Sequence, residues 1–306
     1  MHTFSERRIL HGAAVMLVVL MLSAFQSARA QIVERPLVTG QHGIVTSLDP
    51  LASMAGMKIL LKGGNAFDAA VATAVAVAVV DPKNSTIGGQ GFATVRVAKT
   101  GEVLALNFFG PAPKGATVDA LKGKDYGEGY LATPVPSNVR GYQELHRNYG
   151  RLSWAEVLEP AIELAEKGFV VTADFSHYVE QYKPLLSKYS ATRDVFLPGG
   201  RVPQPGDIFV QKDLAWTLKT MAAEGAEAFY SGPIAKRIVD FYQKHGGLLT
   251  PEDLSSYQAR WVKPISTTYR GITFYTPPPN SSGIALLLEL NLLEGYDLKS
   301  MGHNTP

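Results

Sequence analysis

The sequence predicts an α/β protein in which helices pack against a β-sheet. Residues 93–97 alternate between apolar and polar, Thr100 and Gly101 follow as a turn, and residues 103–108 form a second apolar stretch. This pattern is typical of a β-hairpin. Residues 66–80 are almost entirely apolar and rich in alanine, which predicts a helix that is buried on several faces. Helices next to a hairpin are expected to cover one face of its sheet.

The alanine-rich stretch is interpreted as a core helix rather than a membrane span. Only Thr73 is polar between Ala69 and Val80, but this run is shorter than the ~20 residues that a span needs. Asn65 is a good N-cap, and Asp68 would lie in the first turn, where the helix dipole favours a negative charge. Pro82 disfavours continuation of the helix.

A second helix is predicted just before it. Asp49 can cap this helix, Pro50 suits its first position, and two glycines at 63 and 64 end it. Apolar residues recur within it at helical spacing, namely Leu51, Met54, Ala55 and Leu61. The preceding residues 43–47 are predicted to form a short strand.

The remaining chain predicts several capped helices and one more strand. Ser153 and Glu156 form a capping-box pattern, and Gly168 ends that helix. Further helices are expected within residues 209–225, 231–247, 250–261 and 284–293, and a strand within 269–276 leads into a proline-rich turn.

The first 30 residues have the three parts of a secretory signal peptide. Two arginines at 7 and 8 precede an apolar run at 13–22, and an Ala-Arg-Ala sequence at 28–30 predicts cleavage before Gln31. The alternative is an uncleaved membrane anchor. Cleavage would remove the excess positive charge, which argues against nucleic-acid binding, and would place the protein in the periplasm or outside the cell.

The composition excludes several kinds of chemistry. The chain has no cysteine, so disulfides, thiol nucleophiles and cysteine metal clusters are excluded. Its histidines form no tight ligand pair, which makes a zinc site an unfavoured interpretation. A P-loop, a G-x-G-x-x-G motif and a G-x-S-x-G motif are all missing from the sequence.

Several segments, taken together and in order, resemble the large subunit of the gamma-glutamyltransferases, which are N-terminal-nucleophile hydrolases. The similarity covers nearly the whole chain after the signal peptide. It is carried by HGIVTSLDPLASMAGMKILLKGGNAFDAAVATAVAVAVVDP, STIGGQGF, YGRLSWAEVLEPAIELAEKGFVV, GAEAFYSGPIAKRIVD, GGLLTPEDLSSYQARW and PPPNSSG.

The resemblance implies an αββα sandwich, present here only in part, and an exported precursor that cuts itself in two. A threonine at the new N-terminus of the small subunit would attack the γ-amide of a glutathione-like substrate. No metal or organic cofactor is implied. No threonine of this chain matches that nucleophile, so residues 31–306 are expected to be a large-subunit domain that ends before the catalytic small subunit, its partner.

The chain departs from the family at the residues that bind substrate. The family holds the glutamyl α-carboxylate with the arginine of a D-F-R-E motif. Here Asn107 stands at the aspartate, Phe109 at the arginine and Gly110 at the glutamate. Phe109 and Asn107 are therefore the candidate substrate-binding residues, and no catalytic residue is expected in this chain. A phenyl ring cannot hold a carboxylate as a guanidinium does, so this departure favours an apolar acyl group. Arg140 or Arg96 could replace the missing cation.

Three functions remain open at this point. The first is hydrolysis or transfer of the γ-glutamyl group of glutathione-like amides. The second is an acylase-like hydrolysis of a different amide, which Phe109 favours. The third is a non-catalytic relic of the large subunit that serves as a binding or structural protein. The loop PPPNSSG is equally compatible with a place near the substrate and with a plain turn before a helix.

Overall fold

A computed structural model describes residues 37–303 of the chain. The chain divides into two units, residues 1–42 and 43–306. Of the first unit only residues 37–42 are described, and they contain no helix or strand. The predicted signal peptide at 1–30 lies outside the described residues.

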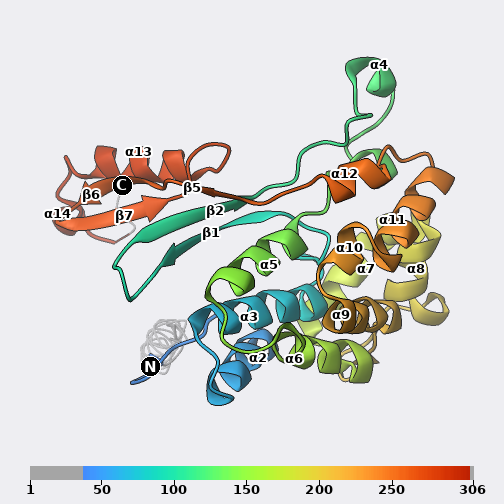
Figure 1. Ribbon diagram of the computed structural model, residues 1–306, viewed down its shortest axis with the longest axis horizontal. Coiled ribbons are helices and arrows are strands. Elements are labelled where there is room, and N and C mark those ends of the chain that lie inside the picture. Colours follow the sequence, from blue (N-terminus) through green and yellow to red (C-terminus); the bar gives the residue numbers. More distant parts are fainter. Residues whose placement is uncertain (1–36, 304–306) are drawn as a thin grey trace, which may run out of the picture. The chain divides into compact units, whose positions relative to one another are not determined.

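The second unit is built around α3 (Ala66–Val80), the alanine-rich helix. It contacts α2 (Pro50–Leu61), α5 (Asn138–Tyr149) and α6 (Trp154–Lys167), and α6 in turn packs on α9 (Lys212–Glu224) (Figure 1). Side chains on several faces of α3 are fully buried, including Val71, Ala72, Val75, Ala76 and Val79. The prediction of a helix buried on several sides is confirmed, and within residues 37–303 no helix is long and apolar enough to cross a membrane.

The other helices surround this core or follow it. They are α4 (Val118–Leu121), α7 (Ala173–Lys188), α8 (Ser190–Phe196), α10 (Glu227–Tyr230), α11 (Pro233–Lys244), α12 (Pro251–Ser255), α13 (Gly283–Leu293) and α14 (Leu298–Met301), with short 3-10 turns at Gly129–Leu131 and Pro198–Gly200.

The predicted hairpin is present and has gained a third strand. β1 (Gly91–Arg96) pairs antiparallel with β2 (Val103–Phe108), which pairs antiparallel with β5 (Arg260–Val262). Two smaller antiparallel pairs complete the strands of the described residues: β3 (Phe169–Val170) with β4 (Ile208–Phe209), and β6 (Ile265–Tyr269) with β7 (Ile272–Thr276).

The two faces of the β1–β2–β5 sheet differ. Leu106 and Phe108 are buried in the hydrophobic core, on the face that α5 contacts. Asn107 lies between them in sequence, and because successive side chains of a strand point to opposite faces, it belongs to the other face. We call this second face the outer face; it carries Phe92, Asn107 and Arg260, which are directly opposite one another across the three strands.

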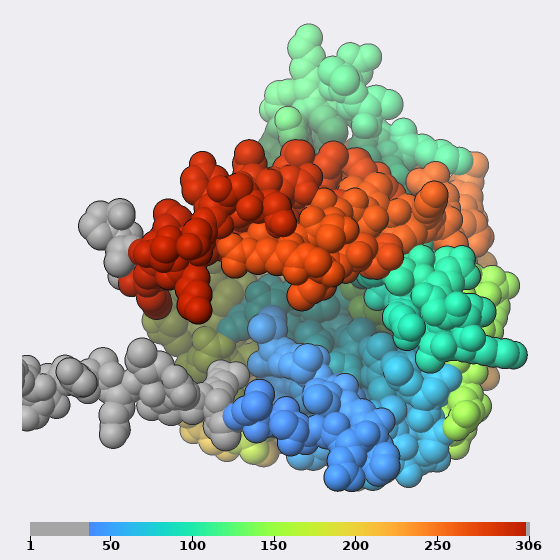
Figure 2. All heavy atoms as spheres, turned by 90° about the vertical axis from the view of Figure 1, so that its left-hand side faces the viewer, coloured from blue at the N-terminus to red at the C-terminus, as the bar shows by residue number. Residues whose placement is uncertain are grey.

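The last described segment forms a separate layer. α13 packs on the β6–β7 hairpin, and both are seen in red and orange in Figure 2. α13 is apolar all round, but only Leu287 is buried. The other large apolar residues of the helix are exposed, with Leu288 at 57% and Leu292 at 71%.

The predicted caps are confirmed. Asn65 and Asp68 form a capping box at the start of α3, as do Ser153 and Glu156 at the start of α6. The Asp49 side chain accepts a hydrogen bond from Leu51 N at the start of α2. In each case the side chain satisfies a backbone N–H that has no partner within its helix.

Two predictions were wrong. Residues 43–47 form no strand, since they pair with none of the described strands. The helix predicted within residues 250–261 ends at Ser255, and Arg260–Val262 is the strand β5. Pairing with the exposed edge of β2 decided the structure of that segment, and such a long-range pairing is not visible in a local sequence pattern.

Candidate functional site

Asn107 and Phe109 lie at the end of β2, where the chain leaves the sheet. The Asn107 Oδ1 accepts a hydrogen bond from the Phe109 backbone N at 3.0 Å. The Phe109 ring stacks on Phe92 of β1, with 5.5 Å between ring centroids, and remains 40% exposed. The Phe109 side chain is therefore half of an aromatic pair that offers an apolar surface and no hydrogen-bond donor.

Asn107 also connects the sheet to the proline-rich loop. Its Nδ2 donates a hydrogen bond to the Asn280 Oδ1 at 2.8 Å. Within the loop, Ser281 Oγ donates to the Pro277 carbonyl at 2.7 Å and accepts from Gly283 N at 3.2 Å. The loop thus lies beside the candidate site. The Ser281 hydroxyl is engaged in forming the turn before α13.

Gly110 lies so close to the neighbouring backbone that a side chain is excluded there. A Cβ at this position would lie 2.0 Å from the carbonyl oxygen of Val135. The neighbouring Val135 N donates to the Pro111 carbonyl at 2.9 Å, which holds the two segments together. An acidic residue at 110 would require a shift of the backbone.

The glycine-rich turn before β1 is held by the start of α5. The backbone N–H groups of Ser137 and Asn138 both donate to the Gly89 carbonyl at 3.0 Å. Ser137 Oγ donates to the Phe108 carbonyl at 2.6 Å. A Cβ at Gly89 would lie 2.7 Å from Asn138 Nδ2, so close packing within the protein accounts for this glycine.

A cavity of about 360 Å³ opens beside Asn107 and Phe109. One side is the chain that leaves β2, and the other is the chain that joins α12 to β5. It is lined by Asn107, Phe109, Pro111, Ala112, Lys114, Val135, Asp253, Ser256, Tyr257, Gln258 and Arg260.

Tyr257 is one of two buried polar residues that line this cavity, the other being Asp253. Burial raises the pKa of its phenol, while a hydrogen bond with Ser137 and the charges of Arg260 and Arg140 lower it by smaller amounts. The net direction of the pKa shift is upward, so the phenol is protonated at neutral pH.

The two carboxylates near the cavity, Asp253 and Glu252, are already engaged by other groups. Asp253 accepts hydrogen bonds from Lys114 N at 2.9 Å and from Thr250 N and Oγ1 at 2.9 and 2.7 Å. Burial opposes ionisation of Asp253, but these hydrogen bonds outweigh it and hold the pKa of its carboxyl below the usual range. Glu252 pairs with Lys114 Nζ at 2.6 Å.

Neither arginine considered as a substitute cation reaches the site. The Arg140 side chain is buried, pairs with Glu227 and stacks on the Tyr230 ring, 4.1 Å from its centroid. Arg96 faces Val103, at the opposite end of the β1–β2 pair from Phe92. Sequence reasoning missed Arg260, which stands directly opposite Asn107, because the segment was interpreted as the end of a helix. β5 has three residues, which is too short for a periodic pattern to reveal a strand.

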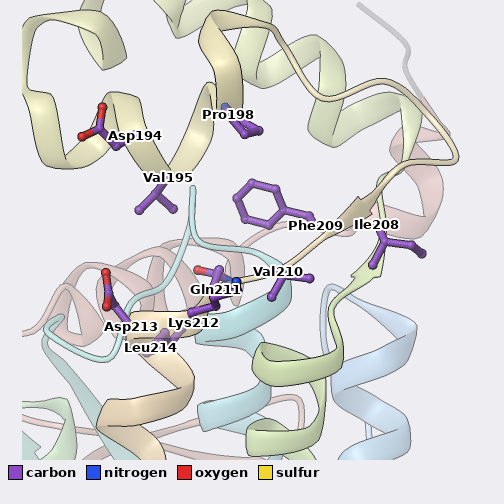
Figure 3. Close-up of a pocket in the computed structure, with 10 residues that line it drawn as sticks. All are labelled: Asp194, Val195, Pro198, Ile208, Phe209, Val210, Gln211, Lys212, Asp213 and Leu214. Atoms are coloured by element: carbon purple, nitrogen blue, oxygen red, sulfur yellow. The ribbon is translucent and has the colours of Figure 1, made fainter.

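A larger cavity lies elsewhere and shows no arrangement for catalysis. Its volume is about 410 Å³, and it is lined by Asp194, Val195, Pro198, Ile208, Phe209, Val210, Gln211, Lys212, Asp213 and Leu214 (Figure 3). These residues come from α8 and the 3-10 turn that follows it, from β4, and from the start of α9 with the two residues before it. Asp194 is engaged with the neighbouring Arg193, and the remaining lining is mainly apolar.

The helical layer on a sheet whose outer face carries the candidate site defines part of an N-terminal-nucleophile hydrolase fold. The sequence model of the gamma-glutamyltranspeptidase family matches residues 52–306. The chain therefore belongs to the gamma-glutamyltranspeptidase family, as its motifs indicated.

The relatives are of two kinds. The chain is 42% identical over 272 residues to a glutathione hydrolase-like YwrD proenzyme of Bacillus subtilis, covering 88% of this chain and 52% of the relative. It is 39% identical over 283 residues to an acylase ACY 1 proenzyme of Pseudomonas sp. strain V22, covering 88% and 50%. The crystal structure of Helicobacter pylori gamma-glutamyltranspeptidase matches with a TM-score of 0.84 at 39% identity, covering 88% of this chain and 80% of that one.

The chain spans about half the length of these curated relatives. It corresponds to the large-subunit region of the family.

Proposed function

We propose that the whole protein hydrolyses an amide or transfers its acyl group, and that this chain supplies the surface that binds the acyl donor. The family match over residues 52–306 carries this proposal. The nucleophile is a threonine in a segment that follows this chain and becomes N-terminal by self-cleavage. The description of both curated relatives as proenzymes supports this maturation.

The chemistry needs only groups of the protein. The threonine hydroxyl attacks the amide carbonyl while its own α-amine accepts the proton. Backbone N–H groups stabilise the oxyanion, the amine leaves, and an acyl ester remains. Water resolves the ester in hydrolysis, and an amino acid resolves it in transfer. The first candidate donor is the γ-glutamyl group of a glutathione-like amide, by similarity to the glutathione hydrolase relatives.

A second candidate is an acylase that acts on a different amide, and Phe109 favours it. A γ-glutamyl donor presents an α-carboxylate, and a carboxylate left without a partner in a desolvated site is costly. At position 109 it would meet the ring that stacks on Phe92. The 39% identity to an acylase proenzyme is in line with this alternative.

We also propose that residues 1–30 are a signal peptide and that residues 31–306 form the large-subunit domain of an exported protein, in the periplasm or outside the cell. N-terminal sequencing of the exported protein tests this. A mature chain that begins at Gln31 is expected, and a retained Met1 in the membrane fraction would contradict it.

The proposed function is tested with the product of the whole gene. Mass spectrometry is expected to show two fragments, the second beginning with threonine, and the cleaved protein is expected to release p-nitroaniline from acyl anilides. An intact chain that turns over no γ-glutamyl or other acyl anilide would favour the non-catalytic alternative.

A further inference from the structure

A third cavity, of about 350 Å³, is lined largely by aromatic side chains, and we call it the aromatic cavity. It is formed by the 3-10 turn Gly129–Leu131, the junction of α7 and α8, and the end of α11. Four rings line it, those of Tyr130, Tyr189, Phe241 and Tyr242. None of its lining residues lines the cavity beside Phe109. Its volume is near the lower end of the roughly 300–1,000 Å³ that is usual for small-molecule sites, so it suits a small ligand.

The rings of the aromatic cavity are arranged around Tyr130. The planes of Tyr189, Phe241 and Tyr242 lie at 83°, 70° and 88° to the Tyr130 ring, with centroids 5.3, 5.7 and 6.2 Å from its centroid. His245 stacks on Tyr130 at 4.8 Å and is not among the residues that line the cavity, so it supports the central ring from outside. Several rings at steep angles to one another form the kind of cage in which aromatic side chains enclose an ammonium group.

Contacts within the protein hold two of these rings in place. Gly129 has a φ of +76°, which glycine adopts without strain, and a Cβ there would lie 2.4 Å from the Tyr189 hydroxyl oxygen. This glycine therefore allows the Tyr189 ring to approach the 3-10 turn. The Tyr242 hydroxyl donates a hydrogen bond to Thr133 Oγ1 at 2.9 Å. Because the walls are fixed in this way, binding requires little ordering of side chains.

The charge of the aromatic cavity favours a cation. Glu128 is the one charged side chain among the described residues that line it. Glu128 pairs with Lys188, but the Lys188 side chain is 56% exposed and does not line the cavity. The faces of aromatic rings carry partial negative charge, as does a carboxylate, so both kinds of group attract a positive ligand. An anion would find no Lys or Arg among the described lining residues.

We propose that the aromatic cavity binds a small molecule with a quaternary ammonium group, such as choline, through cation–π contacts. The methyl groups of such a cation need no hydrogen bond, and they can bury apolar surface against Leu185 and Leu186. A primary ammonium group would lose hydrogen bonds to water that aromatic rings do not replace. This site goes beyond the proposed amide hydrolysis, since it uses neither Phe109 nor the nucleophile and stands whether or not the protein is an amidase.

The test compares choline with dimethylbutanol, the alcohol in which a carbon atom replaces the charged nitrogen of choline. Calorimetric titration of the full-length protein is expected to show that choline binds roughly 2- to 30-fold more tightly, the range for a cation–π contact. Tyr130→Leu keeps an apolar side chain but removes the central ring, and it is expected to lower this preference. Tyr130→Phe keeps the ring and is expected to retain it. Glu128→Gln is expected to weaken choline binding and to leave the alcohol unchanged.

The same ammonium group occurs in free solutes and in phosphatidylcholine, and sedimentation with phosphatidylcholine vesicles separates these sources. Choline binding without sedimentation is expected, and it would assign the site to a free solute. Sedimentation that Tyr130→Leu abolishes would assign the same site to the lipid headgroup.

Tyr182→Leu is the matched control, because it removes a ring from α7 that pairs with Tyr178 outside the aromatic cavity, and it is expected to leave choline binding unchanged. Thermal unfolding checks that each variant is folded, and Tyr189→Leu replaces Tyr130→Leu if the latter does not fold. Equal affinity of wild type for choline and the alcohol, no binding of choline, or a preference that loss of either ring leaves unchanged would overturn the proposal.

Discussion

Gly110 and Val135 approach so closely that a Cβ on Gly110 would lie 2.0 Å from the Val135 carbonyl oxygen. Residue 110 is thus fixed as glycine by the backbone opposite it. A side chain of any kind at this position, two residues after Phe108, would require the backbone to shift.

Gly110→Ala is therefore expected to destabilise the protein by about 1–3 kcal/mol, the usual cost of inserting a group into a closely packed place. Gly115→Ala is the control, because a Cβ there meets its nearest neighbour, the Leu248 carbonyl oxygen, at an ordinary 3.5 Å. Thermal unfolding of the full-length protein measures both variants. If the two variants unfold at the same midpoint temperature, the backbone at Val135 shifts at little cost in free energy, which would contradict this prediction.

Asp68 is expected to stabilise the helical core through its buried hydrogen bonds. It is fully buried, and its carboxylate accepts from the backbone N of Asn65 at 2.9 Å and of Arg151 at 3.0 Å. Asp68→Asn places an amide group among these donors and is expected to cost about 1–3 kcal/mol of unfolding free energy. Urea unfolding measures this, with Asp119→Asn in the exposed α4 as control; a loss no larger than that of the control would refute the role.

Asp253 is expected to make stability depend on pH in the acid range. Its carboxyl pKa is lowered in the folded protein, so the carboxylate contributes stability above the unfolded pKa of about 3.9, and this contribution is lost as pH falls through the folded value. Urea unfolding between neutral and acid pH is expected to give a shallower pH dependence for Asp253→Asn than for wild type. Parallel curves would contradict this.

Residues 31–306 expressed alone are expected to lack amidase activity and to be poorly soluble. The apolar helix α13 leaves Leu286, Leu288 and Leu292 exposed at 47%, 57% and 71%, and a contiguous exposed apolar surface favours aggregation. Size-exclusion chromatography and an anilide assay of the purified fragment test this. A soluble monomer with a sharp thermal transition, or one that releases p-nitroaniline, would contradict it.

Local signals in the sequence were sufficient for much of the fold. The capping residues Asn65 and Ser153 marked helix starts, and alternation marked the β1–β2 hairpin, because caps and side-chain periodicity are properties of adjacent residues. The sequence did not reveal β5, whose pairing with β2 joins residues more than 150 positions apart.

The residues of the candidate site also divide into those that a local sequence motif identifies and those whose place depends on long-range contacts. Comparison of the 107–110 stretch with the family motif identified Asn107 and Phe109, and the structure places both at one cavity. Arg260 was missed since its position depends on strand pairing. Conversely, Arg140 was a reasonable candidate by residue type, but its burial against Tyr230 and Glu227 is a tertiary property.

The central claim is that position 109 selects the acyl donor, and one ratio tests it most directly. The ratio is kcat/KM for γ-glutamyl p-nitroanilide over kcat/KM for an acyl p-nitroanilide without the α-carboxylate, measured in the full-length enzyme and in Phe109→Arg. We predict that wild type favours the second donor and that the variant raises the ratio by up to roughly 10- to 150-fold. The shift is expected to be incomplete, because Asn107 and Gly110 provide no acid to orient the new guanidinium. A wild type that strongly prefers the γ-glutamyl donor, with a ratio that Phe109→Arg leaves unchanged, would contradict the claim.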